Sequence, residues 1–281
     1  MEKEKPKKEL EHSEKLNTEF LEHAQKRNVT VRDEQYEFPV LLDAIHRCRK
    51  AGYRYRLIDS GRFDISSLEW LGEKGADVYS SDEYRIDPKE LEFINISTRK
   101  GNAITAYLFN SSFESEEQGN KSEKISFSDL LLIGNKGIYI HLSNRNHQRD
   151  ISKLTELADL CYRNGSWLVY YHHGDFETNL VELVKNKAWV HISDNNFQQE
   201  ENPFLLEEAL KSSGPDAKRF VFHIEKNIEH SQLKKIHQAK AYIIFPAFSL
   251  DLQPRFQFIT EKFKKKKLDF KAYFLYQEFM Q

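Results

Sequence analysis

GNKGIYIHLSNRN at residues 134–146 and VKNKAWVHISDNN at residues 184–196 follow one pattern about 50 residues apart. Each stretch ends a helical pattern, continues with a short run of alternating residues typical of a strand, and closes on a polar turn. A second overlap matches residues 87–110 with residues 150–173 in the spacing of leucines and of a helix-ending glycine. The sequence therefore predicts about four degenerate αβαβ repeats of ~50 residues each.

Short runs rich in β-branched and aromatic residues alternate with helical patterns from Phe38 onward. The strand candidates are residues 53–59, 77–80, 103–109, 138–142, 167–172, 189–193, 220–224, 241–245 and 270–276. Single helices between consecutive strands require a parallel sheet, and right-handed crossovers place these helices on one side of it. The pattern predicts an α/β fold, a TIM-type (βα)8-like barrel, with the segment 270–276 in an extra C-terminal αβ unit.

An open doubly wound sheet is the rival architecture. A dinucleotide-binding sheet of that kind normally has a glycine-rich first turn, whereas the first turn here is DSGRFD at residues 59–64. The chain contains no GxGxxG sequence. The regular repeat favours the barrel.

Composition divides the chain into a tail and a single domain. Residues 1–33 are rich in Lys and Glu and predict a charged, partly disordered tail, whereas residues 34–281 predict one α/β barrel domain. The polar stretch 111–126 interrupts the repeats and predicts a loop at the face that carries the carboxyl ends of the strands.

Charge and cysteine content limit the partners and the compartment. A formal net charge of -2 argues against binding to nucleic acid or to an anionic membrane surface. Cys48 and Cys161 lie in helical patterns without a CxxC motif, which indicates reduced structural thiols. The sequence shows neither an apolar leader nor a span of roughly 20 apolar residues, so we expect a cytoplasmic protein. We expect its partner to be a small-molecule ligand or a protein.

Alternation along the strands predicts which side chains face the barrel interior. Aliphatic residues such as Ile140 and Ile192 suit the face covered by helices, so their neighbours must point inward. The inward set consists of Tyr139, His141, Ser143, Trp189, His191, Ser193, Val221, His223 and Glu225, with Tyr170 and His172 added by the repeat alignment. A barrel interior is usually closed by Val, Ile and Leu, so this polar layer is the main indication of a site.

The first hypothesis is a metal-assisted hydrolase or lyase acting on a small molecule. Imidazole and carboxylate groups suit Zn or Mn, and a bound water could then ionise near neutral pH. The predicted metal ligands are His141, His191 and His223, and the predicted catalytic residues are Glu225, Asp194 and His172. The sequence contains neither an HxH nor an HExxH motif.

Two other classes of function remain open. A metal-free acid–base enzyme could act on a sugar-like substrate with Asp194 and Glu225 at neighbouring strand ends. A non-catalytic barrel could serve as a protein-interaction or scaffolding module, with the histidines as a hydrogen-bonded inner layer. Asp64 and Asp150 each precede a helical pattern and are interpreted as helix caps.

Overall fold

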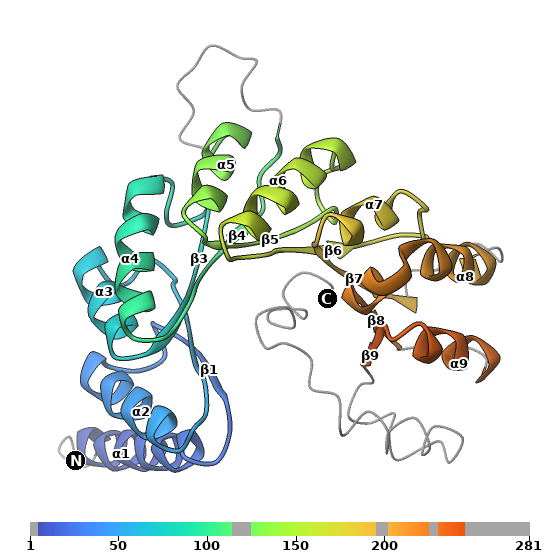
Figure 1. Ribbon diagram of the computed structural model, residues 1–281. Helices are drawn as coiled ribbons and strands as arrows, with labels where there is room; N and C mark the ends of the chain where they lie inside the picture. The colour runs from blue at the N-terminus through green and yellow to red at the C-terminus, as the bar shows by residue number, and fades with distance from the viewer. Residues whose placement is uncertain (1–4, 114–124, 195–201, 225–229, 245–281) are drawn as a thin grey trace. The chain divides into compact units, whose positions relative to one another are not determined.

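The chain folds as alternating helices and parallel strands. The computed structural model describes residues 5–113, 125–194, 202–224 and 230–244 (Figure 1). Across these ranges, nine parallel strands lie in one sheet in the order of the chain, from β1 to β9. Because the strand order never reverses, the doubly wound alternative is excluded. Helices alternate with parallel strands in chain order, as in α/β folds of the TIM type.

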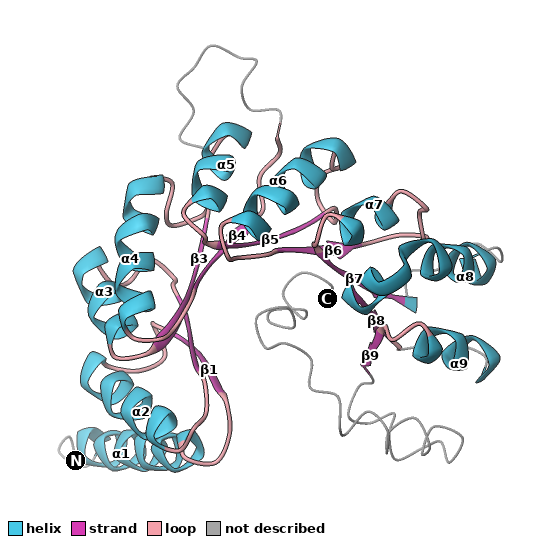
Figure 2. Cartoon of the chain, viewed as in Figure 1, coloured by secondary structure: helices cyan, strands magenta, loops and turns pink. Residues whose placement is uncertain are grey.

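The strands agree closely with the sequence patterns (Figure 2). They are β1 Val29–Arg32, β2 Tyr55–Ile58, β3 Ala76–Ser81, β4 Thr105–Phe109, β5 Tyr139–Ser143, β6 Leu168–His172, β7 Trp189–Ser193, β8 Phe220–His223 and β9 Tyr242–Ile244. Every predicted strand from 53–59 to 241–245 is confirmed within a few residues. The candidate at 270–276 lies outside the described residues.

Helices separate consecutive strands. They are α1 Lys5–Ala24, α2 Phe38–Lys50, α3 Ile65–Glu73, α4 Pro88–Lys100, α5 Phe127–Asn135, α6 Ile151–Arg163, α7 Leu180–Lys185, α8 Asn202–Ser213, α9 His230–Gln238 and the 3-10 helix η2 Gly214–Arg219. Asp64 and Asp150 cap α3 and α6 as expected, because their side chains accept hydrogen bonds from the backbone N–H groups of Ser67 and Ser152. Among the described helices, none is long and apolar enough to cross a membrane.

The first strand lies in the segment whose composition predicts a charged tail. Val29 and Val31 of β1 are buried, and β1 pairs in parallel with β2. Phe20 and Ala24 of α1 belong to the same hydrophobic core. Two β-branched residues alternating with polar ones are sufficient for a strand that buries one face, so the charged composition conceals it.

The chain divides into two compact units, and the boundary falls at the end of β4, between Leu108 and Phe109. In the first unit, Leu57 and Val78 of the strands share a core with Leu41 and Leu68 of the helices, which identifies the helix-covered face of the sheet. Helices α3 and α4 approach closely, because a Cβ at Gly101 would lie 2.1 Å from the Gly72 carbonyl oxygen.

In the second unit, the contacts of one glycine show which strand face the helices cover. A Cβ at Gly134 of α5 would lie 3.1 Å from Cys161 Sγ of α6 and 3.5 Å from Ile140 Cδ1 of β5. Ile140 therefore faces α5 and α6. Because successive strand residues point to opposite faces, His141 lies on the other face, called here the inner face. Burial also raises the pKa of the Cys161 thiol to about 12, as expected of a structural cysteine.

Candidate functional site

A row of aromatic side chains crosses four neighbouring strands of the second unit. The inner-face row, as we call it, consists of His141 on β5, Tyr171 on β6, His191 on β7 and His223 on β8. The strand register sets Tyr171 beside His191 and His223 beside Ser193. Each member of the row is at most 2% exposed. Their shared face and burial confirm that the alternation pattern identified the inner side of β5, β7 and β8.

Hydrogen bonds and ring contacts connect the members of the row. His141 Nδ1 lies 3.1 Å from Tyr171 Oη, and His191 Nδ1 lies 2.9 Å from His223 Nε2. The rings of Tyr171 and His191 are 4.7 Å apart between centroids, which joins the two hydrogen-bonded pairs. The row is therefore continuous from β5 to β8.

Burial keeps His141 and His223 neutral. It lowers the pKa of His141 to about 3, and the nearby His191 contributes in the same direction. Burial likewise holds the pKa of His223 well below its usual value. A neutral imidazole has one N–H donor and one acceptor nitrogen. In the bond between His191 and His223, one ring therefore donates its proton to the other.

The row reaches the carboxyl ends of β7 and β8. His223 is the last residue of β8, and Ser193 beside it is the last residue of β7. Asp194 follows directly and is 4% exposed, so it places a buried carboxylate at the same ends. Ligands of parallel α/β folds bind at these strand ends. Glu225, the predicted partner of Asp194, lies outside the described residues.

His172 does not belong to the row, contrary to the repeat alignment. The register pairs His172 with Ile192 and Tyr170 with Val190, so both point to the helix-covered face. His172 Nε2 donates to the carbonyl oxygen of Asp175 at 2.7 Å, and burial lowers the pKa of this imidazole. A shift of one residue moves every side chain to the other face, and the alignment was wrong by one residue.

Tyr171 takes the inward position that the alignment gave to its neighbours. The stretch YYHH at 170–173 contains two tyrosines followed by two histidines, so both faces of β6 have the same aromatic pattern. The register with β7 sets Tyr171 opposite His191, and this identifies Tyr171 as an inward residue of β6. The sequence alone does not give this register.

A metal at the row remains a prediction. Within the described ranges, no group of three or more His, Cys, Asp or Glu side chains could hold a metal ion. His191 Nδ1 and His223 Nε2 bind each other. A Zn or Mn ion bound by His141, His191 and His223 would therefore have to use His191 Nε2 and His223 Nδ1, the ring nitrogens outside this bond.

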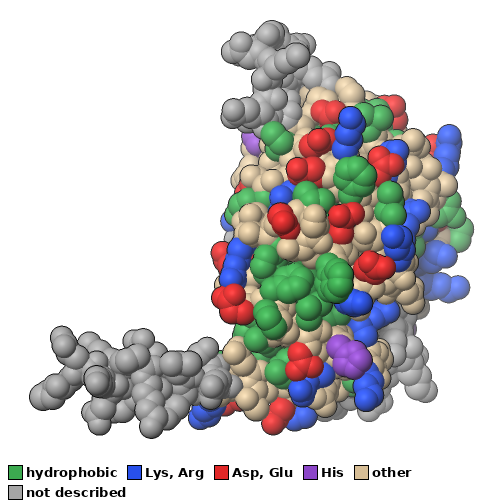
Figure 3. Space-filling view, turned by 90° about the vertical axis from the view of Figure 1, so that its left-hand side faces the viewer, with side chains coloured by type: hydrophobic (Ala, Val, Ile, Leu, Met, Phe, Trp, Pro, Cys, Tyr) green, Lys and Arg blue, Asp and Glu red, His purple; other side chains and the backbone are tan. Residues whose placement is uncertain are grey.

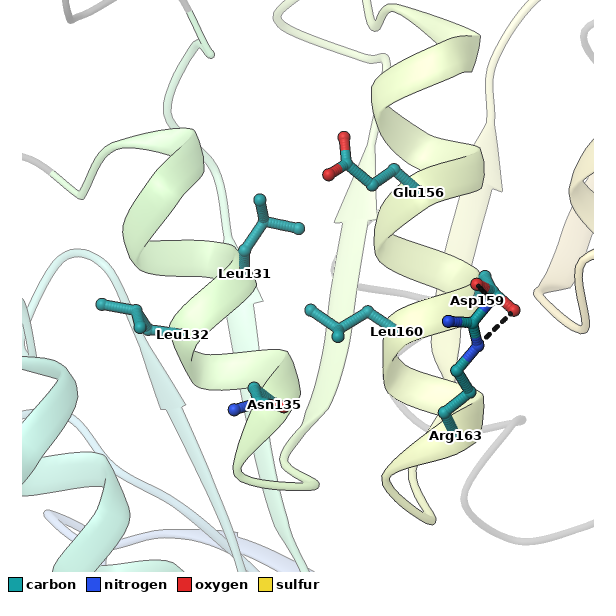
Figure 4. A pocket seen from close by; sticks show the side chains of 7 residues that line it. All are labelled: Leu131, Leu132, Asn135, Glu156, Asp159, Leu160 and Arg163. Atoms are coloured by element: carbon teal, nitrogen blue, oxygen red, sulfur yellow. Dashed lines mark hydrogen bonds and ion pairs between the residues drawn. The ribbon is translucent and has the colours of Figure 1, made fainter.

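A groove of about 410 Å³ lies between α5 and α6 on the helix-covered side of the second unit (Figure 4). Its lining residues are Leu131, Leu132, Asn135, Glu156, Asp159, Leu160 and Arg163. Arg163 Nε donates to Asp159 Oδ1 at 3.2 Å, so the two opposite charges satisfy each other. With leucines on both walls and an ion pair along one helix, the groove has no polar groups that converge on a ligand.

Comparison with known proteins gives no family. No family model matches the chain, and no curated protein matches it. Deoxyribose phosphate aldolase from Aeropyrum pernix is similar over 88% of this chain and 92% of its own, with 11% identity and a TM-score of 0.30. Phospho-2-dehydro-3-deoxyheptonate aldolase from Thermotoga maritima is similar over 78% of this chain and 70% of its own, with 10% identity and a TM-score of 0.35. At such TM-scores, the activities of these two enzymes say nothing about this chain.

Proposed function

We propose that the chain is an enzyme that moves a proton on a small-molecule substrate, with the pair His191 and His223 as its acid–base group. The observation that carries the proposal is the direct bond between the two imidazoles, 2.9 Å from Nδ1 to Nε2, at the carboxyl end of β8. Positioned imidazoles are the commonest groups in general acid–base catalysis.

The pair can take up one proton and pass it on. A neutral His223 that carries its proton on Nε2 can accept the substrate proton at Nδ1 and pass the Nε2 proton to His191 Nδ1, which leaves His191 as the imidazolium. The proton returns by the reverse path when the product forms.

The rest of the row has a positioning role in this proposal. His141 lies in the middle of β5 and not at its carboxyl end, where ligands of parallel α/β folds bind. Its bond to Tyr171 holds the phenol ring against His191, with 4.7 Å between the ring centroids. The base is therefore His223 and its support is His141 with Tyr171.

The test incubates the protein with pooled small hydroxy and oxo compounds in deuterated buffer. NMR then detects turnover of a compound or the exchange of its protons for deuterium. General acid–base groups contribute roughly a hundredfold to ten-thousandfold, so we expect His223→Gln to slow the reaction at least about a hundredfold. His46→Gln, at an exposed position of α2, is the matched control and should react like the wild type. A His223→Gln protein that reacts at the wild-type rate, or a wild type that exchanges no compound, contradicts the proposal.

One observation favours the alternative, a protein-interaction module. Trp70 of α3 and Phe93 and Ile96 of α4 are about half exposed, at 52%, 53% and 48%. Figure 3 shows hydrophobic side chains gathered among charged ones on one face of the molecule. Exposed apolar patches often mark protein contacts. Self-association that Phe93→Ser abolishes would support this function.

A further inference from the structure

A second polar cluster lies in the first unit, at the carboxyl ends of β1, β2 and β3. Asp33 follows β1, and its backbone N–H donates to the Ile58 carbonyl oxygen at 3.0 Å. Asp59 follows β2, and its N–H donates to the Tyr79 carbonyl oxygen at 2.8 Å. The sheet register thus continues beyond the strands and brings two carboxylates into one row at the end where parallel sheets bind ligands.

Asp59 has partners for both carboxylate oxygens. Arg85 Nε lies 2.8 Å from Oδ2 and Arg85 Nη2 lies 3.1 Å from Oδ1, which forms a bidentate ion pair. Ser80 Oγ donates to Oδ2 at 2.9 Å, and the Gly61 N–H donates to Oδ1 at 2.9 Å. Asp59 is therefore a satisfied structural carboxylate that fixes Arg85 and the loop after β2.

Asp33 is satisfied at one oxygen only. Its Oδ1 accepts from the Ser60 N–H at 3.1 Å and from the Ser60 hydroxyl. Its Oδ2 is buried and has no hydrogen-bond partner in the part of the chain that the structure describes. The whole residue is 0% exposed. A buried carboxylate oxygen without a donor is costly, and this cost is offset if a bound ligand supplies the donor.

Of the carboxylates of Asp33 and Asp59, one has no cationic side-chain partner among the described residues. Asp33 and Asp59 carry two negative charges, against which Arg85 supplies one positive charge. Arg62 Nη2 lies 2.9 Å from Glu37 Oε1, so these two side chains cancel each other. A ligand with one positive charge would balance the Asp33 carboxylate, whereas a divalent cation would leave one positive charge over beside it.

An exposed aromatic ring lies beside the same loop. A Cβ at Gly61, which has a φ of +80°, would come within 2.8 Å of Tyr84 Cδ1. The Tyr84 side chain therefore packs on the backbone next to Ser60, and yet the residue is 43% exposed. Tyrosine rings attract organic cations that lie against their faces.

We propose that Asp33 is the anionic anchor of a binding site for a small organic molecule with a primary ammonium group. The ammonium N–H donates to Asp33 Oδ2, its charge balances that of the Asp33 carboxylate, and the carbon part of the ligand lies against Tyr84. This site is independent of the proposed acid–base pair, because all its residues belong to the first unit.

Calorimetric titration of the full chain at constant ionic strength tests the proposal. The probe is propylammonium chloride, and the comparison ligands are tetramethylammonium chloride, which has the same charge but no N–H, and magnesium chloride. We expect saturable binding of propylammonium at millimolar concentrations and weaker or no binding of the other two. No propylammonium binding, or equal binding of tetramethylammonium or magnesium, would overturn the proposal.

Variants connect the binding to the named residues. Asp33→Asn should weaken propylammonium binding about tenfold or more, because it removes a charged hydrogen-bond acceptor. Asp43→Asn, on α2 of the same unit, removes an exposed ion pair with Arg47 and is the matched control. Tyr84→Leu, at an exposed position that should leave folding intact, is expected to weaken binding about threefold. Wild-type affinity in either Asp33→Asn or Tyr84→Leu would contradict the proposal.

Discussion

The buried His141 makes the protein sensitive to acid by a predictable amount. Its pKa is about 3 in the folded chain against 6.5 for an ordinary histidine. Below pH 6.5 the unfolded chain binds a proton that the folded chain does not, so stability is complete above this pH and is lost as the pH falls. Between about pH 7.5 and pH 5, His141 alone should lower the free energy of unfolding by about 2 kcal/mol.

The other buried histidines act in the same direction. Burial lowers the pKa of His172 and of His223, so the total loss in the wild type should exceed the share of His141. Urea unfolding at both pH values measures this loss. In His141→Gln, which has no proton to bind but can still hydrogen-bond Tyr171, the loss should be about 2 kcal/mol smaller.

His46→Gln provides the control, because the side chain is exposed on α2 and its replacement should leave the wild-type pH dependence unchanged. If His141→Gln and the wild type lost the same free energy between the two pH values, His141 would not be a buried neutral imidazole. The electrostatic account of the inner-face row would then be refuted.

Removal of residues 1–33 should lower the melting temperature strongly, since it deletes a strand and a helix that contribute to the core; an unchanged melting curve would show that they are dispensable. Gly101→Ala should cost about 3 kcal/mol in urea unfolding, because its Cβ would overlap the Gly72 carbonyl oxygen. The metal prediction is tested by elemental analysis of untagged protein: about one equivalent of Zn or Mn supports it, and less than about a tenth, with no binding on titration, removes it.

The sequence predicted the fold wherever one face of a strand is clearly apolar. YIHLS on β5 and WVHIS on β7 place Ile140 and Ile192 toward the helices, and the histidines between them therefore face inward. On β6 the doubled tyrosines and histidines make both faces alike. The face of His172 then depends on hydrogen-bond register with β7, which no local pattern contains.

The cluster around Asp33 could not be found from the sequence for a related reason. Its partner Ser60 is 27 residues away, and they meet only because β1 pairs with β2. The charged composition of residues 1–33 concealed β1, so neither that pairing nor the carboxylate at its end could be inferred. Contacts that depend on a short polar strand are visible only in three dimensions.

The bond between His191 and His223 is the central claim about function, and nitrogen-15 NMR of the histidine side chains tests it most directly. We predict a coupling across the hydrogen bond between His191 Nδ1 and His223 Nε2, which His223→Gln abolishes. We also predict that His223 stays neutral well below pH 6.5, because burial holds its pKa far below the ordinary value. No such coupling, or a His223 that becomes protonated near neutral pH, would contradict the account.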